Sequence, residues 1–376
     1  MKKILLVFGT RPEAIKMAPL VDAFKKNKNF QMKVCVTGQH REMLDQVLEL
    51  FQITPDYDLN LMKPGQTLND VTSEVLTKIR PILLEYKPDL LFVHGDTATT
   101  FASSLAAYYE KIDVAHIEAG LRTGDIYSPW PEEINRKLTG SIARFHFAPT
   151  EIARSNLLQE NVKPENIYVT GNTVIDSLMS VKEKITTEVN LESHLYSLFS
   201  FIDFSKNIIL VTGHRRENFG SGMEEVCKTL SKLSKQRSDL EIIYPVHLNP
   251  NVQRPVQTYL SGHENIHLIE PLDYLPFTYL MMKAKIIITD SGGIQEEAPS
   301  LGKPVLVTRE TTERPEAVDA GTVKLVGTSG DLISNCVKEL LDNPDHYAEF
   351  DKLKNPYGDG QACKKIIELL EVKYEL

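Results

Sequence analysis

Several features that would each define a class of protein are missing from this sequence. No apolar run approaches the roughly 20 residues that span a bilayer, so we expect no membrane partner. The four cysteines, Cys35, Cys227, Cys336 and Cys363, are widely scattered and form no Cys-x-x-Cys pair, which argues against a disulfide framework or a zinc site. The net charge of −9 argues against a broad nucleic-acid surface. These absences favour a cytoplasmic protein without a nucleic-acid partner.

Motifs for two common cofactors are also missing. A nicotinamide site needs a Gly-x-Gly-x-x-Gly turn after a strand; Gly220-Ser221-Gly222 comes nearest, but Glu225 stands at the third glycine position. His94-Gly95-Asp96 and His116-Ile117-Glu118 resemble metal-ligand spacing on strands, yet there is no His-Glu-x-x-His motif, and arginines and lysines could neutralise phosphate without a metal. We therefore expect neither NAD nor a metal as cofactor.

The length and the hydrophobic pattern indicate two α/β halves. A chain of 376 residues suits two domains of roughly 150 to 200 residues. Short apolar, β-branched runs alternate with amphipathic segments of helix length, which is typical of parallel sheets covered on both faces. The boundary is expected near 171–175, and a helix over 361–373 could return to the first half. The predicted strands are 3–8, 33–37, 89–93, 112–116, 145–147 and 166–170, then 207–212, 241–245, 266–269, 285–289, 304–307 and 323–326.

The second half contains a candidate diphosphate site. The run 286–290 is predicted to be a buried strand, Ser291-Gly292-Gly293 a tight turn, and 294–298 the opening of a helix. Backbone N–H groups at such a helix start present partial positive charge to a phosphate. Glu297, one turn on, could accept hydrogen bonds from ribose hydroxyls. The alternative is an ordinary turn with Glu297 on a solvated face.

The first strand is followed by a similar arrangement in Gly9-Thr10-Arg11-Pro12-Glu13. Gly9 allows a sharp turn and Pro12 suits the first turn of a helix. Arg11 and Lys16 could direct positive charge at a phosphate, or they could be ordinary exposed helix residues. Their position favours function, because ligands bind beyond the carboxyl ends of strands in such folds.

Acidic and basic side chains are predicted to gather at the strand ends. Asp96 and Glu118 each follow a buried strand, Glu132 and Arg136 are spaced to share a helix face, and His214 ends a strand of the second half. Proton abstraction at a sugar carbon would need such a set. Each residue also has a plainer interpretation: Asp96 could cap a helix, Glu132 and Arg136 could form a surface ion pair, and His214 could be a satisfied turn histidine.

Together these motifs resemble the non-hydrolysing UDP-N-acetylglucosamine 2-epimerase family. The resemblance covers nearly the whole chain, and the order and spacing of the motifs make it specific. It implies an α/β fold of two Rossmann-like domains in a glycosyltransferase-B arrangement, with the active site in the interdomain cleft. The domains would be 1–172 and 173–360, with a terminal helix of about 361–376 on the first. The motifs are Phe8-Gly9-Thr10-Arg11-Pro12-Glu13, His94-Gly95-Asp96-Thr97, His116-Ile117-Glu118-Ala119-Gly120-Leu121-Arg122, Gly171-Asn172-Thr173, Gly213-His214-Arg215-Arg216-Glu217-Asn218, Asp290-Ser291-Gly292-Gly293-Ile294-Gln295-Glu296-Glu297 and Glu313-Arg314-Pro315-Glu316.

The resemblance also implies an activity and its residues. The family's homodimers interconvert UDP-GlcNAc and UDP-ManNAc by anti elimination of UDP to 2-acetamidoglucal and syn re-addition, which feeds surface polysaccharide or cell-wall polymer synthesis. Asp96, Glu118 and Glu132 would share the proton transfers at C2, while His214 would stabilise departing UDP. The residues that would bind the nucleotide are Arg11, Leu272, Phe277, Ser291, Gly292, Gly293, Glu297 and Arg314, and Lys16 and Arg136 would join the catalytic set around the sugar and phosphate.

Some relatives bind a second UDP-GlcNAc as an activator, through a region that corresponds here to Gln39, His40 and Gln66. Glu42 and Gly65 stand where strongly activated members are expected to have Gln and Arg, which weakens that expectation. Three other functions stay open from the sequence: a retaining glycosyltransferase of the same architecture, a hydrolysing epimerase, and a non-catalytic nucleotide-sugar sensor.

Overall fold

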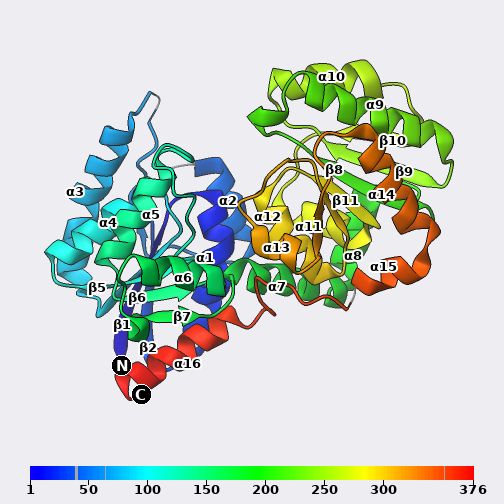
Figure 1. The fold of residues 1–376 in the computed structure, drawn as a ribbon. Helices are drawn as coiled ribbons and strands as arrows, with labels where there is room; N and C mark the ends of the chain where they lie inside the picture. The colour runs from blue at the N-terminus through cyan, green and yellow to red at the C-terminus, as the bar shows by residue number, and fades with distance from the viewer. Residues whose placement is uncertain (39–40, 64, 351) are drawn as a thin grey trace. The chain divides into compact units, whose positions relative to one another are not determined.

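The computed structural model describes residues 1–38, 41–63, 65–350 and 352–376. The chain divides into two compact units, the first made of residues 1–180 and 357–376 and the second of residues 181–356 (Figure 1). Each unit is built around one parallel sheet with helices on both faces. The domain boundaries expected after residues 172 and 360 stay a prediction.

The first unit contains a parallel sheet in the order β3-β2-β1-β4-β5-β6-β7. Its strands are β1 (Lys2–Phe8), β2 (Phe30–Val36), β3 (Tyr57–Asp58), β4 (Leu90–His94), β5 (Asp113–Ile117), β6 (Phe145–Ala148) and β7 (Ile167–Val169). Its helices are α1 (Arg11–Lys26), α2 (Arg41–Leu50), α3 (Leu68–Tyr86), α4 (Ala98–Tyr109), α5 (Glu132–Ile142), α6 (Glu151–Gln159), the 3-10 turn η1 (Pro164–Asn166), the start of α7 (Thr173–Thr187), and α16 (Ala362–Tyr374).

Alternating side chains of the central strands fill a core on each face of this sheet, because successive residues of a strand point to opposite sides. Leu5 and Val7 of β1 pack on one face with Ile79 of α3 and Ala106 of α4. On the other face, the ring of Phe92 in β4 lies edge-on to Phe24 of α1, with 5.4 Å between centroids, and stacks on Phe147 of β6 at 6.1 Å. Burial on both faces explains why these strands are continuous apolar runs.

The second unit repeats the plan with a parallel sheet in the order β10-β9-β8-β11-β12-β13. Its strands are β8 (Asn207–Thr212), β9 (Leu240–Pro245), β10 (Ile266–Ile269), β11 (Ile286–Thr289), β12 (Val305–Val307) and β13 (Val323–Leu325). Its helices are the rest of α7, α8 (Val189–Leu198), α9 (Ser221–Gln236), α10 (Pro250–Leu260), α11 (Tyr274–Lys283), α12 (Gly292–Glu297), α13 (Pro315–Asp319), α14 (Gly330–Asp342) and α15 (Pro344–Phe350), with 3-10 turns η2 (Arg216–Asn218) and η3 (Ala298–Leu301). The core on one face joins β8, β9 and β11 to α9, α10 and α14.

Both sheets change their winding direction beside the first strand of the unit. Strand order runs outward from β1 through β2 to β3 on one side and restarts at β4 on the other, and β8 and β11 stand in the same relation. In open parallel sheets, ligands bind beyond the carboxyl ends of the strands at such a switch point. The switch points therefore direct attention to the ends of β1 and β4, and of β8 and β11.

The predicted α/β fold with two Rossmann-like parallel sheets is confirmed. Each predicted strand corresponds to an observed one, whereas the two-residue β3 was not predicted because it is too short to carry a hydrophobic pattern. The predicted terminal helix is α16, which belongs to the first unit and packs against α1. Within the described residues, no helix is long and apolar enough to cross a membrane.

Candidate active site

The turn after β1 is built around a buried carboxylate. Thr10 caps α1 through its hydroxyl, and Glu13 accepts hydrogen bonds from the backbone N–H groups of Gly9 (2.9 Å) and Thr10 (2.8 Å), which completes a capping box. Burial raises the pKa of Glu13, and a hydrogen bond from Thr97 opposes this. A Cβ on Gly9 would lie 1.9 Å from Oγ1 of Thr37, so only glycine fits this turn.

Arg11 and Lys16 are both carried by the helix that this turn starts. Arg11 is its first residue, and both side chains are partly buried. Nζ of Lys16 forms an ion pair with Oε2 of Glu118. The interpretation of Lys16 as an ordinary exposed helix residue is therefore wrong.

The ends of β4 and β5 are held together by backbone and histidine contacts. The N–H of Gly95 donates to the carbonyl of Ile117 (3.0 Å), and Nε2 of His116 lies 2.7 Å from the carbonyl of Gly95. Because a carbonyl only accepts, Nε2 of His116 carries the proton. Burial lowers the pKa of His116 to about 3. The neutral ring thus fixes the strand ends that carry Asp96 and Glu118.

Glu118 is held by two side chains from distant parts of the chain, and a third lies close by. Besides its ion pair with Lys16, it accepts a hydrogen bond from Nδ2 of Asn172 (2.7 Å), and Nε2 of His94 lies 3.8 Å away. Its backbone φ of 63° falls in the left-handed region, which is strained for a residue other than glycine. The surrounding contacts therefore stabilise Glu118 in one orientation at the sheet edge.

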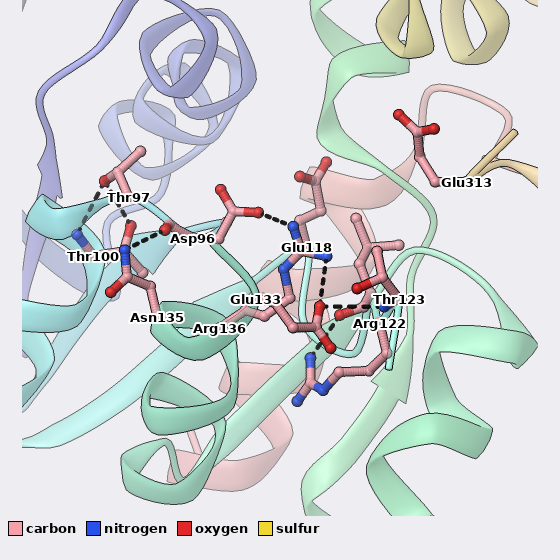
Figure 2. A network of polar contacts seen from close by, with 12 residues as sticks. Asp96, Thr97, Thr100, Glu118, Arg122, Thr123, Glu133, Asn135, Arg136 and Glu313 are labelled. Carbon is pink, nitrogen blue, oxygen red and sulfur yellow. Dashed lines mark hydrogen bonds and ion pairs between the residues drawn. The ribbon is translucent and has the colours of Figure 1, made fainter. Parts of the chain in front are cut away.

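Asp96 lies beside Glu118 in a network with Arg136, shown in Figure 2. Nη2 of Arg136 lies 2.5 Å from Oδ2 of Asp96, and Nδ2 of Asn135 donates to the Asp96 carbonyl at 2.9 Å. Burial raises the pKa of Asp96. The positive charge of Arg136 lowers this pKa, and the negative charge of Glu118 raises it further. The cap of α4 is Thr97, not Asp96, so the interpretation of Asp96 as a helix cap is wrong.

Glu132 and Glu133 have different roles at the start of α5. The guanidinium of Arg136 bridges Asp96 and the fully buried Glu133, with 3.4 Å from Nη1 to Oε2 of Glu133. Glu133 also accepts from the backbone N–H groups of Thr123 and Gly124, each at 3.2 Å. Oε2 of Glu132 is buried without a hydrogen-bond partner among the described residues. A carboxylate in that condition is a candidate proton acceptor.

The second unit places His214 against a buried aspartate. His214 follows β8 directly, its side chain is 41% exposed, and its Nδ1 lies 3.4 Å from Oδ1 of Asp290 at the end of β11. The ring also stacks on His247, with 5.5 Å between centroids. Burial lowers the pKa of His214, while Asp290 opposes this. The turn therefore presents an oriented imidazole.

The predicted phosphate turn forms a short helix. Ser291 is its N-cap, and α12 begins at Gly292, two residues earlier than expected. A Cβ on Gly292 would lie 3.3 Å from Oε1 of Glu313 and 3.8 Å from the guanidinium carbon of Arg314, so the glycine lets these groups approach the backbone. Arg314 also forms an ion pair with Glu296. Gly292, Gly293 and Arg314 thus lie around one helix start.

The residues expected around the ribose and the uracil lie at the end of α12 and around α11. Glu297 is the last residue of α12. Glu297 is buried and accepts a hydrogen bond from the hydroxyl of Tyr274 at 2.6 Å, so the interpretation of Glu297 on a solvated face is wrong. Leu272 precedes α11 and Phe277 lies within it; both are partly buried.

Of the three residues expected at a regulatory site, Gln39 and His40 lie outside the described residues. Gln66 accepts a hydrogen bond from the backbone N–H of Lys63 at 2.8 Å. Among residues 1–38, 41–63, 65–350 and 352–376, no group of three or more His, Cys, Asp and Glu side chains is arranged to hold a metal ion.

The structure thus brings Lys16, Asp96, Glu118 and Arg136 together in the first unit. The positions of Asp96 and Glu118 after neighbouring strands indicated that these two carboxylates share one edge of the sheet. Sequence reasoning did not assign Asn172 or Asp290 to the site. Both stand inside quoted motifs, and Asp290 ends a buried strand at a switch point, which is the signal that could have identified it.

Comparisons with known proteins identify the family of this chain. The sequence model of a family described as UDP-N-acetylglucosamine 2-epimerase matches residues 22–371. The UDP-N-acetylglucosamine 2-epimerases of Escherichia coli K12 and Salmonella typhimurium are 59% and 58% identical to this chain, each over 98% of both sequences.

Solved structures give the same result. The crystal structure of UDP-GlcNAc 2-epimerase from Neisseria meningitidis bound to UDP-GlcNAc has a TM-score of 0.89 at 54% identity, and the match covers 98% of this chain and 99% of that one. The Methanocaldococcus jannaschii UDP-GlcNAc 2-epimerase in complex with UDP-GlcNAc and UDP has a TM-score of 0.79 at 34% identity, with the same coverage. With relatives this similar over nearly its whole length, the chain belongs to the UDP-N-acetylglucosamine 2-epimerase family, whose members are isomerases.

Proposed function

We propose that this chain inverts C2 of UDP-GlcNAc to give UDP-ManNAc, and that it releases neither free sugar nor UDP. The observation that carries the proposal is the paired network of Asp96 with Arg136 and Glu118 with Lys16, at the carboxyl ends of two neighbouring strands. Family membership adds the substrate, because the relative from Neisseria meningitidis was solved with UDP-GlcNAc bound.

The chemistry of C2 explains why several carboxylates are needed. No carbonyl is next to C2, so its proton is not acidic, and departure of UDP from C1 must supply the driving force. In the proposed route a carboxylate removes the C2 proton while the C1–O bond breaks, the electron pair leaves with UDP, and a C1=C2 double bond forms in 2-acetamidoglucal. Re-addition of UDP and protonation of the other face of C2 complete the inversion. The elimination of UDP is anti, and its re-addition is syn.

Asp96, Glu118 and Glu132 are the proposed proton donors and acceptors. Asp96 suits a residue that takes up and returns a proton, because its raised pKa brings its two protonation states closer to neutral pH. Lys16 and Arg136 hold the carboxylates of Glu118 and Asp96 in place and contribute positive charge near the substrate.

The nucleotide is proposed to bind the second unit. Its diphosphate would meet Ser291, Gly292, Gly293 and Arg314, where the glycines leave the backbone N–H groups accessible. Glu297 would accept a hydrogen bond from the ribose, and Phe277 and Leu272 would contact the uracil. His214 would stabilise the charge on departing UDP.

Proton NMR of the purified protein with UDP-GlcNAc, in EDTA and without NAD, tests the function. We expect the anomeric signal of UDP-ManNAc to appear and reach a constant ratio with that of UDP-GlcNAc. Accumulation of free ManNAc and UDP would instead indicate a hydrolysing enzyme. An unchanged nucleotide sugar would contradict the proposal.

A further inference from the structure

The two carboxylate oxygens of Asp290 have separate environments. Oδ2 accepts hydrogen bonds from the backbone N–H groups of His214 (2.9 Å) and Arg215 (2.8 Å), and Nδ2 of Asn218 lies 3.4 Å away. This oxygen holds the turn after β8 against the end of β11. A purely structural role would be complete with these contacts.

The other oxygen faces the imidazole. Oδ1 lies 3.4 Å from Nδ1 of His214, and it has no hydrogen-bond partner among the described residues although Asp290 is completely buried. Leaving a buried carboxylate oxygen unsatisfied is costly, so this oxygen favours a proton on Nδ1. A carboxylate beside one ring nitrogen fixes the tautomer and orientation of a histidine in this way.

We propose that Asp290 is a positioning residue that keeps the proton of neutral His214 on Nδ1 and leaves Nε2 as the nitrogen that exchanges a proton with the diphosphate. This inference rests on the proposed function. As the C1–O bond breaks, the imidazolium form of His214 donates its Nε2 proton to the departing β-phosphate oxygen, which keeps the electron pair. The ring is then neutral, with its remaining proton on Nδ1. Re-addition of UDP returns that proton to Nε2.

The charges around the ring show why Asp290 is needed. Arg215 and the stacked ring of His247 both disfavour the protonated form of His214, as does burial, whereas Asp290 favours it. Without the negative charge of Asp290, the remaining groups all act against imidazolium. The pKa of His214 should then fall further below its usual value.

Asp290→Asn separates the positioning role from the structural one. The side-chain carbonyl of asparagine can still accept from the N–H groups of His214 and Arg215, so the turn keeps its contacts. The amide nitrogen would then face Nδ1 as a donor and would require the proton on Nε2 instead. A merely structural Asp290 predicts little change from this substitution.

The second unit supplies a matched control in Glu241. This buried carboxylate of β9 contacts Nε2 of His267 and lies 2.8 Å from Nζ of Lys206. Glu241→Gln therefore changes another buried carboxylate–histidine pair of the same sheet, one with no part in the proposed reaction.

The test is ¹⁵N NMR of histidine-labelled full-length protein, with the His214 signals assigned by their loss in His214→Gln. We expect neutral His214 to be protonated on Nδ1 in the unsubstituted protein and on Nε2 in Asp290→Asn. In that variant we expect kcat to fall about 10- to 100-fold with KM nearly unchanged, and His214 to titrate at lower pH. Glu241→Gln should leave the His214 signals and kcat unchanged.

Two results would overturn the inference. The first is a neutral His214 that carries its proton on Nε2 in the unsubstituted protein, which can be observed even if Asp290→Asn fails to fold. The second is a kcat of Asp290→Asn that equals that of the unsubstituted protein although the proton has moved to Nε2. The NMR result does not depend on turnover. If the unsubstituted protein epimerised nothing, the proposed function would fail while the tautomer assignment could still be measured.

Discussion

At the scale of single residues, the first unit pairs two of the three proposed acid–base carboxylates, Asp96 and Glu118, each with a cation. Arg136 contacts Asp96 and Lys16 contacts Glu118, from helices that begin far from those carboxylates in the sequence. The pairing holds both carboxylates at the sheet edge and keeps their net charge small. It also makes each carboxylate testable by an isosteric amide.

We expect Asp96→Asn to lower kcat by about 10² to 10⁴, the usual contribution of a general acid or base, with the fold retained. The amide cannot take up the C2 proton, although it can still accept from Arg136. Asp113→Asn is the control, since Asp113 pairs with Arg144 at the opposite end of β5. Epimerisation followed by NMR would decide, and equal activity in both variants would remove Asp96 from the mechanism.

Buried histidines should make stability depend on pH. Burial lowers the pKa of His94 to about 4 and of His116 to about 3, both below the roughly 6.5 of an unfolded histidine. Below pH 6.5 the unfolded chain binds protons that the folded chain does not, so stability falls as the pH drops from 6.5 towards 4. Each ring contributes up to about 1.4 kcal/mol per pH unit.

Urea unfolding at pH 7 and pH 5 measures this effect. His116→Gln should show a smaller loss of stability between the two pH values, because glutamine can still donate to the Gly95 carbonyl but does not titrate. The exposed His194 provides the control, and His194→Gln should behave like the unsubstituted protein. An identical pH dependence in all three proteins would show that His116 is protonated equally in both states.

The sequence predicted the residues at strand ends better than the partners they contact. Asp96 and Glu118 follow apolar strands, so their shared edge of the sheet could be inferred. Asn172 contacts Glu118 from 54 positions away and Asp290 contacts His214 from 76. Such contacts depend on the topology of the folded chain, and the hydrophobic periodicity of a single sequence does not predict them.

At the scale of elements, the terminal helix is tied to the first unit through α7. Asp176 of α7 accepts hydrogen bonds from the backbone N–H groups of Ala362 (3.2 Å) and Cys363 (2.9 Å) in the first turn of α16. Farther along, Glu371 accepts from the side chains of Asn27 and Asn29. A carboxylate at a helix start also suits the partial positive charge there.

We expect Asp176→Ala to destabilise the first unit by about 1–3 kcal/mol, since two buried N–H groups lose their acceptor. Asp359→Ala is the matched control: the exposed Asp359 accepts from the N–H of Gln361 just before the same helix, and its loss should cost less than about 0.5 kcal/mol. Urea midpoints of the two variants give the comparison. Equal midpoints would mean that Asp176 does not anchor α16.

Gly9→Ala tests the turn after β1. The added methyl would overlap Oγ1 of Thr37, so we expect a loss of about 1–3 kcal/mol from overpacking. Thr37→Ala in the same chain removes that oxygen and should recover part of the loss, measured by thermal unfolding. Gly293→Ala, where the nearest side-chain atom would be 3.8 Å away, should leave stability nearly unchanged. No recovery in the double variant would show that Thr37 is not the obstacle.

The elements themselves were largely predictable because their strands are buried on both faces. A nearly continuous apolar run such as Leu90–His94 is typical of a parallel strand that is buried on both faces. The start of α12 was placed two residues late because Gly292 and Gly293 are poor helix formers, whereas in the folded chain the helix already begins at Gly292.

At the scale of the whole molecule, the two units repeat one plan with different chemistry at the switch point. The first carries carboxylates paired with cations, and the second carries a short helix start with glycines, Arg314 and the His214–Asp290 pair. The sequence predicted this repetition from its two series of apolar runs. The homodimer expected from the resemblance stays a prediction.

UDP should stabilise the protein without a metal. A ligand at 100 times its Kd adds about 2.7 kcal/mol to the free energy of unfolding, so we expect UDP to raise the melting temperature equally with and without EDTA. Uridine, which lacks the diphosphate, should give a much smaller increase. A stabilisation that EDTA abolished would contradict the assignment of the phosphates to protein groups alone.

Turnover of UDP-GlcNAc in deuterated water, followed by proton NMR of the C2 position, shows whether inversion proceeds through proton exchange at C2. Epimerisation through C2 proton exchange predicts that deuterium enters C2 of UDP-ManNAc and of the recovered UDP-GlcNAc, and that Asp96→Asn abolishes both. UDP-ManNAc that forms with its C2 proton retained would contradict the account, because the proton would then never have reached an exchanging carboxylate.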